Sequence, residues 1–324
     1  MSLKYIEIVP YNPQWPKRYE EEALKIQQLL GNSFKEIHHI GSTAVPGLSA
    51  KDHIDIICVV DNLSDSLCLK QLGYIFKGEI NVPLRYYYSK NTPDLKVNLH
   101  VVTPGHGFIE LNLCFRNYLR QNTDARLDYE SLKIQLLQDP TSFERSNGGF
   151  ARYTLRKDIF IKSILKQANF EGITLNFCTH HQEWEHYHHI KKTEIFNRIP
   201  LTYNRHHPDL ISDHHYHFVM YKGIKIICIA QIEFLDEKVA VLRTLATDAK
   251  YKKQGYATHM IKTLEQWIIH QKRSIIKLHA ALTAESFYRK LGYIEMDFDD
   301  ISILKEKIDM GKYLPQLKEI EEIL

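Results

Sequence analysis

The most constraining feature of this sequence is an apolar segment that leads into a short basic loop and then into a helical pattern. Residues 239–246 are mostly apolar, and the loop that follows reads Lys252-Lys253-Gln254-Gly255-Tyr256-Ala257. Beyond it, apolar side chains recur at spacings of three and four over residues 257–268, which predicts a helix with one buried face. The predicted order is therefore strand, glycine loop and helix.

This order of elements favours the binding of an anion. A helix N-terminus presents free backbone N–H groups and the positive end of the helix dipole. Gly255 allows the backbone to approach a ligand closely, and Lys252 and Lys253 add positive charge. The loop therefore predicts a pyrophosphate site. The alternative is an ordinary strand-to-helix turn that carries two solvated lysines.

A second motif further along the chain favours the pyrophosphate site. Residues 239–293 resemble the core of the GNAT N-acetyltransferases, whose acyl-CoA loop reads Gln/Arg-x-x-Gly-x-Gly/Ala; the loop here differs only in having Lys252 at the first position. Residues 284–293, Ala-Glu-Ser-Phe-Tyr-Arg-Lys-Leu-Gly-Tyr, resemble the helix of that family that bears an acid tyrosine before Leu-Gly-aromatic. Two motifs in the right order, about thirty residues apart, are a strong signal.

The resemblance implies how acetyl-CoA would be bound as a co-substrate. Backbone at the end of the strand would pair with the pantetheine arm, and N–H groups of the loop and first helical turn would hold the pyrophosphate. The implied contacts are Leu245, Ala246, Thr247, Lys252, Lys253, Gln254, Gly255, Tyr256, Ala257 and Thr258.

The resemblance also implies the residues that move protons. Tyr288 matches the acid that protonates the leaving thiolate, which requires close placement because phenols have a pKa near 10 and thiols about 8.5. Many relatives carry a glutamate on the strand before the loop, where this chain has Val241. We expect Glu233, on the neighbouring strand, to be the general base acting through water. A solvated strand residue is the alternative for Glu233.

The composition bounds the rest of the chain. Its 324 residues suffice for two domains, and 44% hydrophobic and 25% charged residues are ordinary for globular proteins. A net charge of +3 gives no sign of a nucleic-acid or membrane partner, and no apolar segment reaches the length of a membrane span. The five cysteines are dispersed without Cys-x-x-Cys, and the N-terminus lacks the apolar run of a signal peptide. We therefore expect a cytoplasmic protein.

A second unusual stretch lies in the N-terminal half. Residues 39–48 read His-Ile-Gly-Ser-Thr-Ala-Val-Pro-Gly-Leu, and Asp55 follows inside the apolar strand pattern of residues 54–60. A charge within such a strand is unfavourable unless it is solvated, paired or bound to metal. Asp55 is therefore predicted to face a cleft.

Residues 5–168 resemble the GrpB family, which has a nucleotidyltransferase-like fold. The likeness rests on residues 39–48 and continues at residues 82–85, 98–101 and 113–120. The resemblance implies a mixed sheet with flanking helices, a Gly-Ser turn for phosphate and a strand carboxylate for metal. The implied pocket consists of His39, Gly41, Ser42, Thr43, Lys51, Asp55, Arg85, His100 and Arg116.

The departures from active nucleotidyltransferases concern the metal ligands. Those enzymes hold two divalent ions with an Asp-x-Asp/Glu pair and a third carboxylate. Here Ile57 takes the second position of the pair, and Asn98 and His100 lie where the third carboxylate is sought. We expect this domain to bind a phosphorylated ligand. Nucleotidyl transfer with Mg²⁺ and a nucleotide is one alternative, and a structural turn with ion-paired arginines is another.

The expected organisation is α/β (α+β) with two domains, a nucleotidyltransferase-like mixed sheet with helices over residues 1–169 and a GNAT fold over residues 170–324. A helix is predicted to begin at Asn12-Pro13 and another to run over residues 151–167. The 18 histidines show no ligand framework, so no metal site is predicted. The predicted function is acetyl transfer from acetyl-CoA to a small-molecule or peptide amine. The alternative is a protein that binds CoA or nucleotide without turnover, and the sequence leaves a homo-oligomer open.

Overall fold

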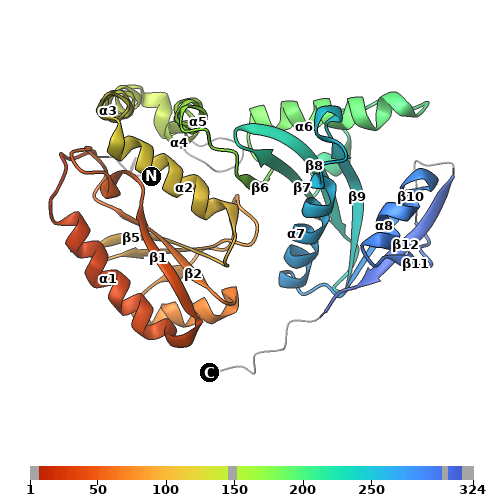
Figure 1. Ribbon diagram of the computed structural model, residues 1–324, viewed down its shortest axis with the longest axis horizontal. Coiled ribbons are helices and arrows are strands. Elements are labelled where there is room, and N and C mark those ends of the chain that lie inside the picture. Colours follow the sequence, from red (N-terminus) through yellow and green to blue (C-terminus); the bar gives the residue numbers. More distant parts are fainter. Residues whose placement is uncertain (1–6, 145–151, 301–305, 316–324) are drawn as a thin grey trace. The chain divides into compact units, whose positions relative to one another are not determined.

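The computed structural model describes residues 7–144, 152–300 and 306–315 (Figure 1). The chain divides into two compact units. The first comprises Met1–Thr174 with Lys222–Lys225, and the second comprises Leu175–Tyr221 with Ile226–Leu324. The expected domain boundary, between residues 169 and 170, lies close to this division and remains a prediction, because compactness alone does not show that each part folds independently.

The first unit contains a mixed sheet in the strand order β1-β2-β5-β4-β3. Only β2 and β5 are parallel neighbours, and the other pairs are antiparallel. The strands are β1 (Phe34–Ile40), β2 (Ile54–Val60), β3 (Ile75–Phe76), β4 (Tyr86–Asn91) and β5 (Lys96–Val102). The helices are α1 (Trp15–Leu30), α2 (Gly107–Gln121), α3 (Thr123–Gln138), α4 (Arg152–Leu155) and α5 (Asp158–Gln167).

Different helices cover the two faces of this sheet. Ile57 of β2 is fully buried and packs against the apolar side of α2. On the opposite face, His39 of β1 stacks on Tyr19 of α1, with ring centroids 4.7 Å apart. Because successive strand residues alternate between faces, Asp55 lies on the α2 face together with Ile57.

The second unit contains a sheet in the strand order β11-β12-β10-β9-β8-β7-β6. Its strands are β6 (Ile173–Phe177), β7 (His215–Lys222), β8 (Lys225–Phe234), β9 (Val239–Thr247), β10 (Ile275–Ala281), β11 (Ile294–Glu295) and β12 (Lys307–Tyr313). Its helices are α6 (His181–Glu194), α7 (Tyr256–His270) and α8 (Glu285–Lys290). The predicted fold class, two units that each combine a mixed sheet with helices, is confirmed.

The core of the second unit is divided by its sheet. On one face, Trp267 of α7 packs among aromatic rings at centroid distances of 4.9 to 5.8 Å; these rings belong to Phe177, Tyr216, Phe218 and Phe234. On the other face, Tyr187 and Ile190 of α6 pack against the alternate residues of β7 and β8. The helix that follows the basic loop is therefore fixed to the sheet by its apolar stripe, as the spacing of three and four predicts.

Two helices differ from the sequence prediction at their bounds. α1 begins at Trp15 with Gln14 as its N-cap, because Asn12 uses its side chain to accept the N–H of Gln14 at 2.9 Å in the preceding turn. The helix predicted over residues 151–167 is two helices, α4 and α5, and residue 151 lies outside the described residues. Hydrophobic periodicity records which side chains are buried and does not record such a break.

Among the residues that the structure describes, no helix combines the length and the apolar character that a membrane crossing requires.

A buried ion pair in the first unit gives a test of this packing. Glu22 of α1 has no exposed side-chain surface; it accepts from Lys90 at 2.7 Å and from the hydroxyl of Tyr74 at 3.0 Å. Burial alone would raise the pKa of Glu22, but the hydrogen bonds from Lys90 and Tyr74 outweigh burial, and the pKa lies below its ordinary value of 4.5.

We expect Lys90→Met to reduce the free energy of unfolding by about 3 kcal/mol at pH 7, because a buried carboxylate would lose its main partner. The control, Lys25→Met, removes a half-exposed lysine 3.3 Å from the same carboxylate and should change it by less than about 1 kcal/mol. A depressed carboxyl pKa contributes stability that is lost as the pH falls through it, so the Lys90→Met effect should shrink below pH 4.5. Equal effects of the two substitutions in urea unfolding would contradict this account.

Candidate functional site

The central strands of the second unit separate from each other. β9 pairs with β10 in parallel only at residues 239–241, which face residues 275–277. Both strands continue beyond these pairs, and they diverge in Figure 1. The edge of β9 that faces β10 is therefore open over its second half.

A β-bulge in β9 precedes this open edge. On β8, Gln231 pairs with Thr244 and Ile232 pairs with Leu242, so Arg243 is the extra residue on β9. A bulge of this kind changes the direction in which the strand presents its groups. At the end of β9, the N–H of Asp248 donates to Ile227 on the β8 side.

Strand alternation then gives the direction of the backbone groups that precede Asp248. Alternate residues of a strand direct their N–H and C=O groups to opposite neighbours. Because Asp248 faces β8, the N–H groups of Leu245 and Thr247 are directed to the open edge, and that of Ala246 is directed to β8. The resemblance assigned pairing with pantetheine to the backbone in this segment.

The basic loop forms an open cradle at the N-terminus of α7. Lys253 and Gly255 both have left-handed backbones, with φ of 59° and 87°. Within the described part of the chain, the N–H groups of residues 253–258 donate to no acceptor. A Cβ atom added to Gly255 would meet nothing within 4 Å. Among the described residues the predicted N–H donors therefore have no acceptor, and the space beside Gly255 is open.

The side chain of Lys252 is not free to contact an anion at this loop, because it is ion-paired. Its ammonium pairs with the carboxylate of Glu194, the last residue of α6, which also accepts the N–H of Ala249 at 3.2 Å. Glu194 is bound as well by Arg198 at 2.7 Å. Lys252 therefore offers no free charge at the loop in this conformation, whereas the side chain of Lys253 is exposed.

Tyr288 lies in α8, which packs against β10. The side chain is buried, and its ring contacts those of Phe287 and Tyr293 at centroid distances of 5.1 and 5.5 Å. Burial raises the pKa of Tyr288, and the thiol of Cys228 adds to the rise. The thiol of Cys228 lies 3.3 Å from the hydroxyl of Thr247. A phenol in this position stays protonated at neutral pH.

Glu233 lies directly opposite Val241 in the register of β8 and β9. Its carboxylate is partly exposed and pairs with Arg243 at 2.5 Å, and His215 lies 3.6 Å from its other oxygen. Arg243 also pairs with Asp300. Glu233 therefore occupies the position that the sequence analysis sought beside Val241, and an arginine binds it there. Its role as general base remains a prediction.

A row of buried and partly buried polar side chains adjoins Glu233 and was not predicted. Gln231 accepts from Lys191 at 2.7 Å and donates to His215 at 2.8 Å. Because His215 receives that bond at Nδ1, its proton is on Nε2, the nitrogen that faces Glu233. Burial lowers the pKa of Lys191 to about 8. Gln231 and His215 alternate with apolar residues along β8 and β7. This alternation in the sequence could have predicted that the polar side chains share one face of the sheet.

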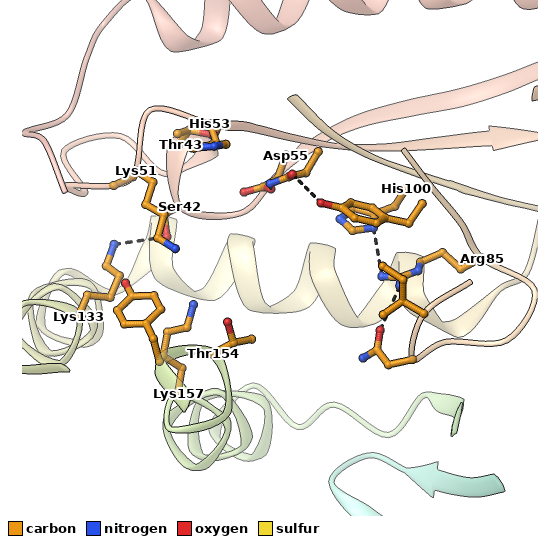
Figure 2. Close-up of a pocket in the computed structure, with 16 residues that line it drawn as sticks. Ser42, Thr43, Lys51, His53, Asp55, Arg85, His100, Lys133, Thr154 and Lys157 are labelled. Atoms are coloured by element: carbon orange, nitrogen blue, oxygen red, sulfur yellow. Dashed lines mark hydrogen bonds between the residues drawn. The ribbon is translucent and has the colours of Figure 1, made fainter. Parts of the chain in front are cut away.

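The first unit contains a cavity of about 540 Å³ on the α2 face of its sheet (Figure 2). Its lining combines cationic, hydroxyl and amide side chains with a single carboxylate, that of Asp55. The lining residues are Ser42, Thr43, Ala50, Lys51, His53, Asp55, Ile80, Asn81, Arg85, Tyr87, Asn98, His100, Lys133, Tyr153, Thr154 and Lys157. Six of the nine residues predicted for this pocket are therefore brought together here.

The three lysines of this cavity come from different elements and converge at one end of it (Figure 2). Lys51 and Lys157 lie over the ring of Tyr153, at 4.6 and 4.7 Å from its centroid. Lys133 of α3 donates to the carbonyl of Ser49 and, at 3.3 Å, to the hydroxyl of Ser42. Within the described residues, no carboxylate lies within 4.0 Å of these three nitrogens.

The electrostatics of these lysines follow from their burial. Burial lowers the pKa of Lys133 to about 7 and that of Lys51 to about 8, and in both cases the charge of Lys157 adds to the effect. Burial also lowers the pKa of Lys157, although Asp55 opposes the shift. The ammonium groups are therefore partly removed from water and have no carboxylate within 4.0 Å among the described residues, and an anion would supply that counter-charge.

Asp55 is fixed by two neighbours. Asn98 of β5 donates to its Oδ1 at 2.8 Å and accepts the hydroxyl of Tyr87 at 2.7 Å. Gly41, with φ of 70°, passes so close that an added Cβ would lie 2.3 Å from Oδ2. Burial raises the pKa of Asp55, and the bond from Asn98 opposes the rise.

This donor set does not fit the metal ions of a nucleotidyltransferase. Asp55 is the one carboxylate in the lining, and Ile57 is buried beneath α2. An amide N–H already occupies Oδ1 of Asp55, and three lysines face the same cavity. Across residues 7–144, 152–300 and 306–315, no three His, Cys, Asp or Glu side chains converge as a metal site requires.

Three of the predicted pocket residues do not line the cavity. His39 lies on the α1 face, where its Nε2 bonds the hydroxyl of Thr43 at 3.0 Å. Arg116 donates to the carbonyl of His39 at 2.8 Å and so fixes the strand that precedes the turn. Gly41 packs closely against the carboxylate of Asp55. The hydroxyl of Thr43 reaches the lining but also donates to the carbonyl of His53 at 3.1 Å.

The segment that carries Lys51 and His53 is anchored by the residue between them. Asp52 accepts from the indole of Trp15 at 2.6 Å and from Arg18 at 3.1 Å. Trp15 is fully buried. Its bond therefore ties the cavity wall to the start of α1.

Sequence reasoning missed two of the three lysines. Lys133 lies between Tyr129 and Leu136 in the spacing of a buried helix stripe, and the side chain is only 3% exposed. A lysine at such a position is itself a signal, because ammonium groups are rarely buried without a function or a partner. Lys157 follows Tyr153 by one helical turn.

The two units define a protein with an open strand edge beside a helix N-terminus in one unit and a lysine-lined cavity in the other. Residues 5–167 match the family model described as GrpB protein, and residues 179–293 match that of the Acetyltransferase (GNAT) family. The chain belongs to the GrpB family and carries a GNAT domain.

Individual relatives cover one half of the chain each. The UPF0157 protein BH1888 of Halalkalibacterium halodurans is 34% identical over 168 residues, which span 51% of this chain and 83% of the relative. The crystal structure of GrpB from Enterococcus faecalis is 34% identical and covers 50% of this chain and 96% of its own, with a TM-score of 0.44. That of an acetyltransferase from Streptococcus agalactiae is 16% identical and covers 45% and 100%, with a TM-score of 0.38.

The contact between Gly41 and Asp55 predicts a cost for any side chain at residue 41. Gly41→Ala should reduce the free energy of unfolding by about 3 kcal/mol, because the added Cβ would strain the backbone and displace Asp55. Gly73→Ala is the control, since Gly73 also has a positive φ, of 81°, but its added Cβ meets nothing within 4 Å. Chemical denaturation measures both. A Gly41→Ala effect no larger than that of Gly73→Ala would show that Asp55 moves aside freely.

Proposed function

We propose that the GNAT domain is an acetyl-CoA-dependent N-acetyltransferase that acts on a small-molecule or peptide amine. The observation that carries the proposal is the meeting, in one unit, of two sets of unpaired backbone donors. One set is the open edge of β9, and the other is the N-terminus of α7. An extended amide-bearing arm that ends in a pyrophosphate, as in acetyl-CoA, satisfies both.

The reaction forms an amide from an amine and a thioester. The amine nitrogen attacks the thioester carbonyl carbon, and the C–S bond breaks as the amide forms. A backbone N–H near Leu245 would stabilise the oxygen that gains charge. The leaving thiolate takes a proton from the phenol of Tyr288, which burial keeps protonated.

The amine must also lose a proton. A lysine-like amine has a pKa of about 10.4 and is mostly protonated at pH 7. Glu233 would accept that proton through water, since Arg243 already occupies one side of its carboxylate. An acceptor amine of low pKa would make less demand on Glu233.

The cradle can be tested by titration calorimetry with acetyl-CoA. Gly255→Asp places negative charge in front of the free N–H groups and should weaken binding by roughly 100-fold. Gly255→Ala is the control: its Cβ meets open space, so only backbone strain is added and binding should weaken far less. Circular dichroism checks the fold of each variant. Failure of the folded wild type to bind acetyl-CoA would refute the proposed cradle.

The acid can be tested by kinetics with an amine acceptor found by screening. Tyr288→Phe should lower kcat by about 100-fold while leaving the affinity for acetyl-CoA unchanged, because the phenol acts only on the leaving thiolate. Tyr293→Phe, which alters the neighbouring ring, is the matched control. A protein that binds CoA without turnover would show no acetylated product with any acceptor, and equal activity of Tyr288→Phe and wild type would exclude Tyr288 as the acid.

We also propose that the cavity of the GrpB domain binds a phosphorylated ligand. Convergence of Lys51, Lys133 and Lys157 on one end of the cavity supports it. The hydroxyl of Ser42 lies at the same end (Figure 2). Nucleotidyl transfer with two Mg²⁺ ions is disfavoured by the donor set, which offers Asp55 alone.

A further inference from the structure

We infer that the GrpB-domain cavity binds the phosphate groups of its ligand with lysine ammonium groups in place of divalent metal ions. The inference rests on the proposal that this cavity takes a phosphorylated ligand, and it adds the means of recognition. The charge count of the cavity supports it. Three lysines lie at one end with one nearby carboxylate, that of Asp55, so these groups carry an excess of two positive charges once an anion has drawn protons onto the lysines. A ligand with two or more negative charges matches that excess.

The position of the lysines agrees with a role that metals play in related folds. Metal ions in a phosphoryl-transfer site neutralise phosphate oxygens from the side of the strand carboxylates. Here Lys51 and Lys157 lie close enough to Asp55 for its negative charge to oppose the lowering of their pKa values by burial. Ammonium nitrogens therefore stand near the carboxylate, and a cation bound at the same place would meet like charge.

The unused hydrogen-bonding groups of the cavity also support recognition of phosphate by lysines. Lys51 and Lys157 contact the ring face of Tyr153, and neither donates to a protein oxygen within the described residues. His53, also in the lining, has a buried Nδ1 without a partner. The site thus holds unused donors at the lysine end, while Asp55 is left as an acceptor for a hydroxyl of the ligand.

Binding should draw protons onto the lysines. At pH 7.5 Lys133 and Lys51 are only partly protonated, with pKa values lowered by burial to about 7 and about 8, and a bound anion raises both. The charged and titratable groups that face them are His53, Asp55, Arg85, Tyr87, His100, Tyr129, Glu130, Tyr153 and Lys157. Burial lowers the pKa of His53 and of His100, so these imidazoles stay neutral at pH 7.5.

The experiment is titration calorimetry of the full chain with inorganic pyrophosphate and, separately, with ATP. Each is measured at pH 7.5 in EDTA and in Mg²⁺. The inference predicts binding in EDTA at least as tight as in Mg²⁺, with net proton uptake seen as a difference in heat between HEPES and Tris buffers. Binding of ATP alone would identify a nucleotide as the source of the phosphates, and binding of both would identify the phosphates themselves.

The variants test the lysines one at a time. Lys133→Met and Lys157→Met should each weaken binding in EDTA roughly 10- to 100-fold, which is the loss expected for a charge-assisted hydrogen bond. Lys133→Met should also reduce the proton uptake. Lys166→Met, an exposed lysine of α5 outside the cavity, is the control. Thermal melting checks each fold, and the two lysines give independent tests if one variant does not fold.

The outcomes distinguish metal-free recognition by lysines from the broader proposal that the cavity binds a phosphorylated ligand. Binding that requires Mg²⁺ would overturn the metal-free recognition and leave a phosphorylated ligand in place. Absence of binding in all conditions would overturn both. Binding in EDTA that Lys133→Met and Lys157→Met leave unchanged would place the phosphate elsewhere and overturn the role of the lysines.

Discussion

A buried or strand-edge polar group needs a partner, and both candidate sites lie where the folded chain itself does not supply one. In the GNAT domain the groups are backbone N–H donors, along β9 beyond residue 241 and at the N-terminus of α7. In the GrpB domain they are ammonium groups that share a cavity with one carboxylate. The surrounding sheets and helices hold these groups in place, because the fully buried cores beneath them leave little freedom to rearrange.

The two sites use different physics to attract negative charge. At the N-terminus of α7 the partial positive charge belongs to the backbone and does not change with pH. Lys252 adds no free charge there, because its ammonium group pairs with Glu194. In the GrpB cavity the charge is carried by side chains whose protonation depends on burial.

Local sequence predicted the order of β9, the basic loop and α7 well, because these elements are consecutive; the acetyl-CoA contacts stay a prediction. Gly255 and the apolar stripe of α7 stand where the spacing puts them. The GrpB cavity was predicted only in part. Ser42, Lys51 and Asp55 lie within one short stretch, whereas Lys133 and Lys157 reach the cavity from helices that the chain forms roughly a hundred residues later, a distance over which periodicity carries no information on contact.

His39 and Arg116 were predicted for the pocket but do not line the cavity, and local sequence did not show this either. His39 belongs to the same motif as Ser42, but strand alternation directs it to the α1 face, and Arg116 reaches its carbonyl rather than the cavity. A motif shows which residues act together and does not show which of them touch the ligand. The bulge at Arg243 is likewise invisible in the sequence, because nothing in the pattern of β9 marks the extra residue.

The bond between Trp15 and Asp52 gives the first unit an optical reporter of its own. The sequence has three tryptophans, Trp15, Trp184 and Trp267, and only Trp15 lies in the first unit. Its indole N–H is bound to a carboxylate whose sequence neighbours, Lys51 and His53, form the cavity wall. In a chain with phenylalanine at residues 184 and 267, the intrinsic emission would come from this one indole. Its wavelength would then follow the electrostatic state of the cavity wall without any added label.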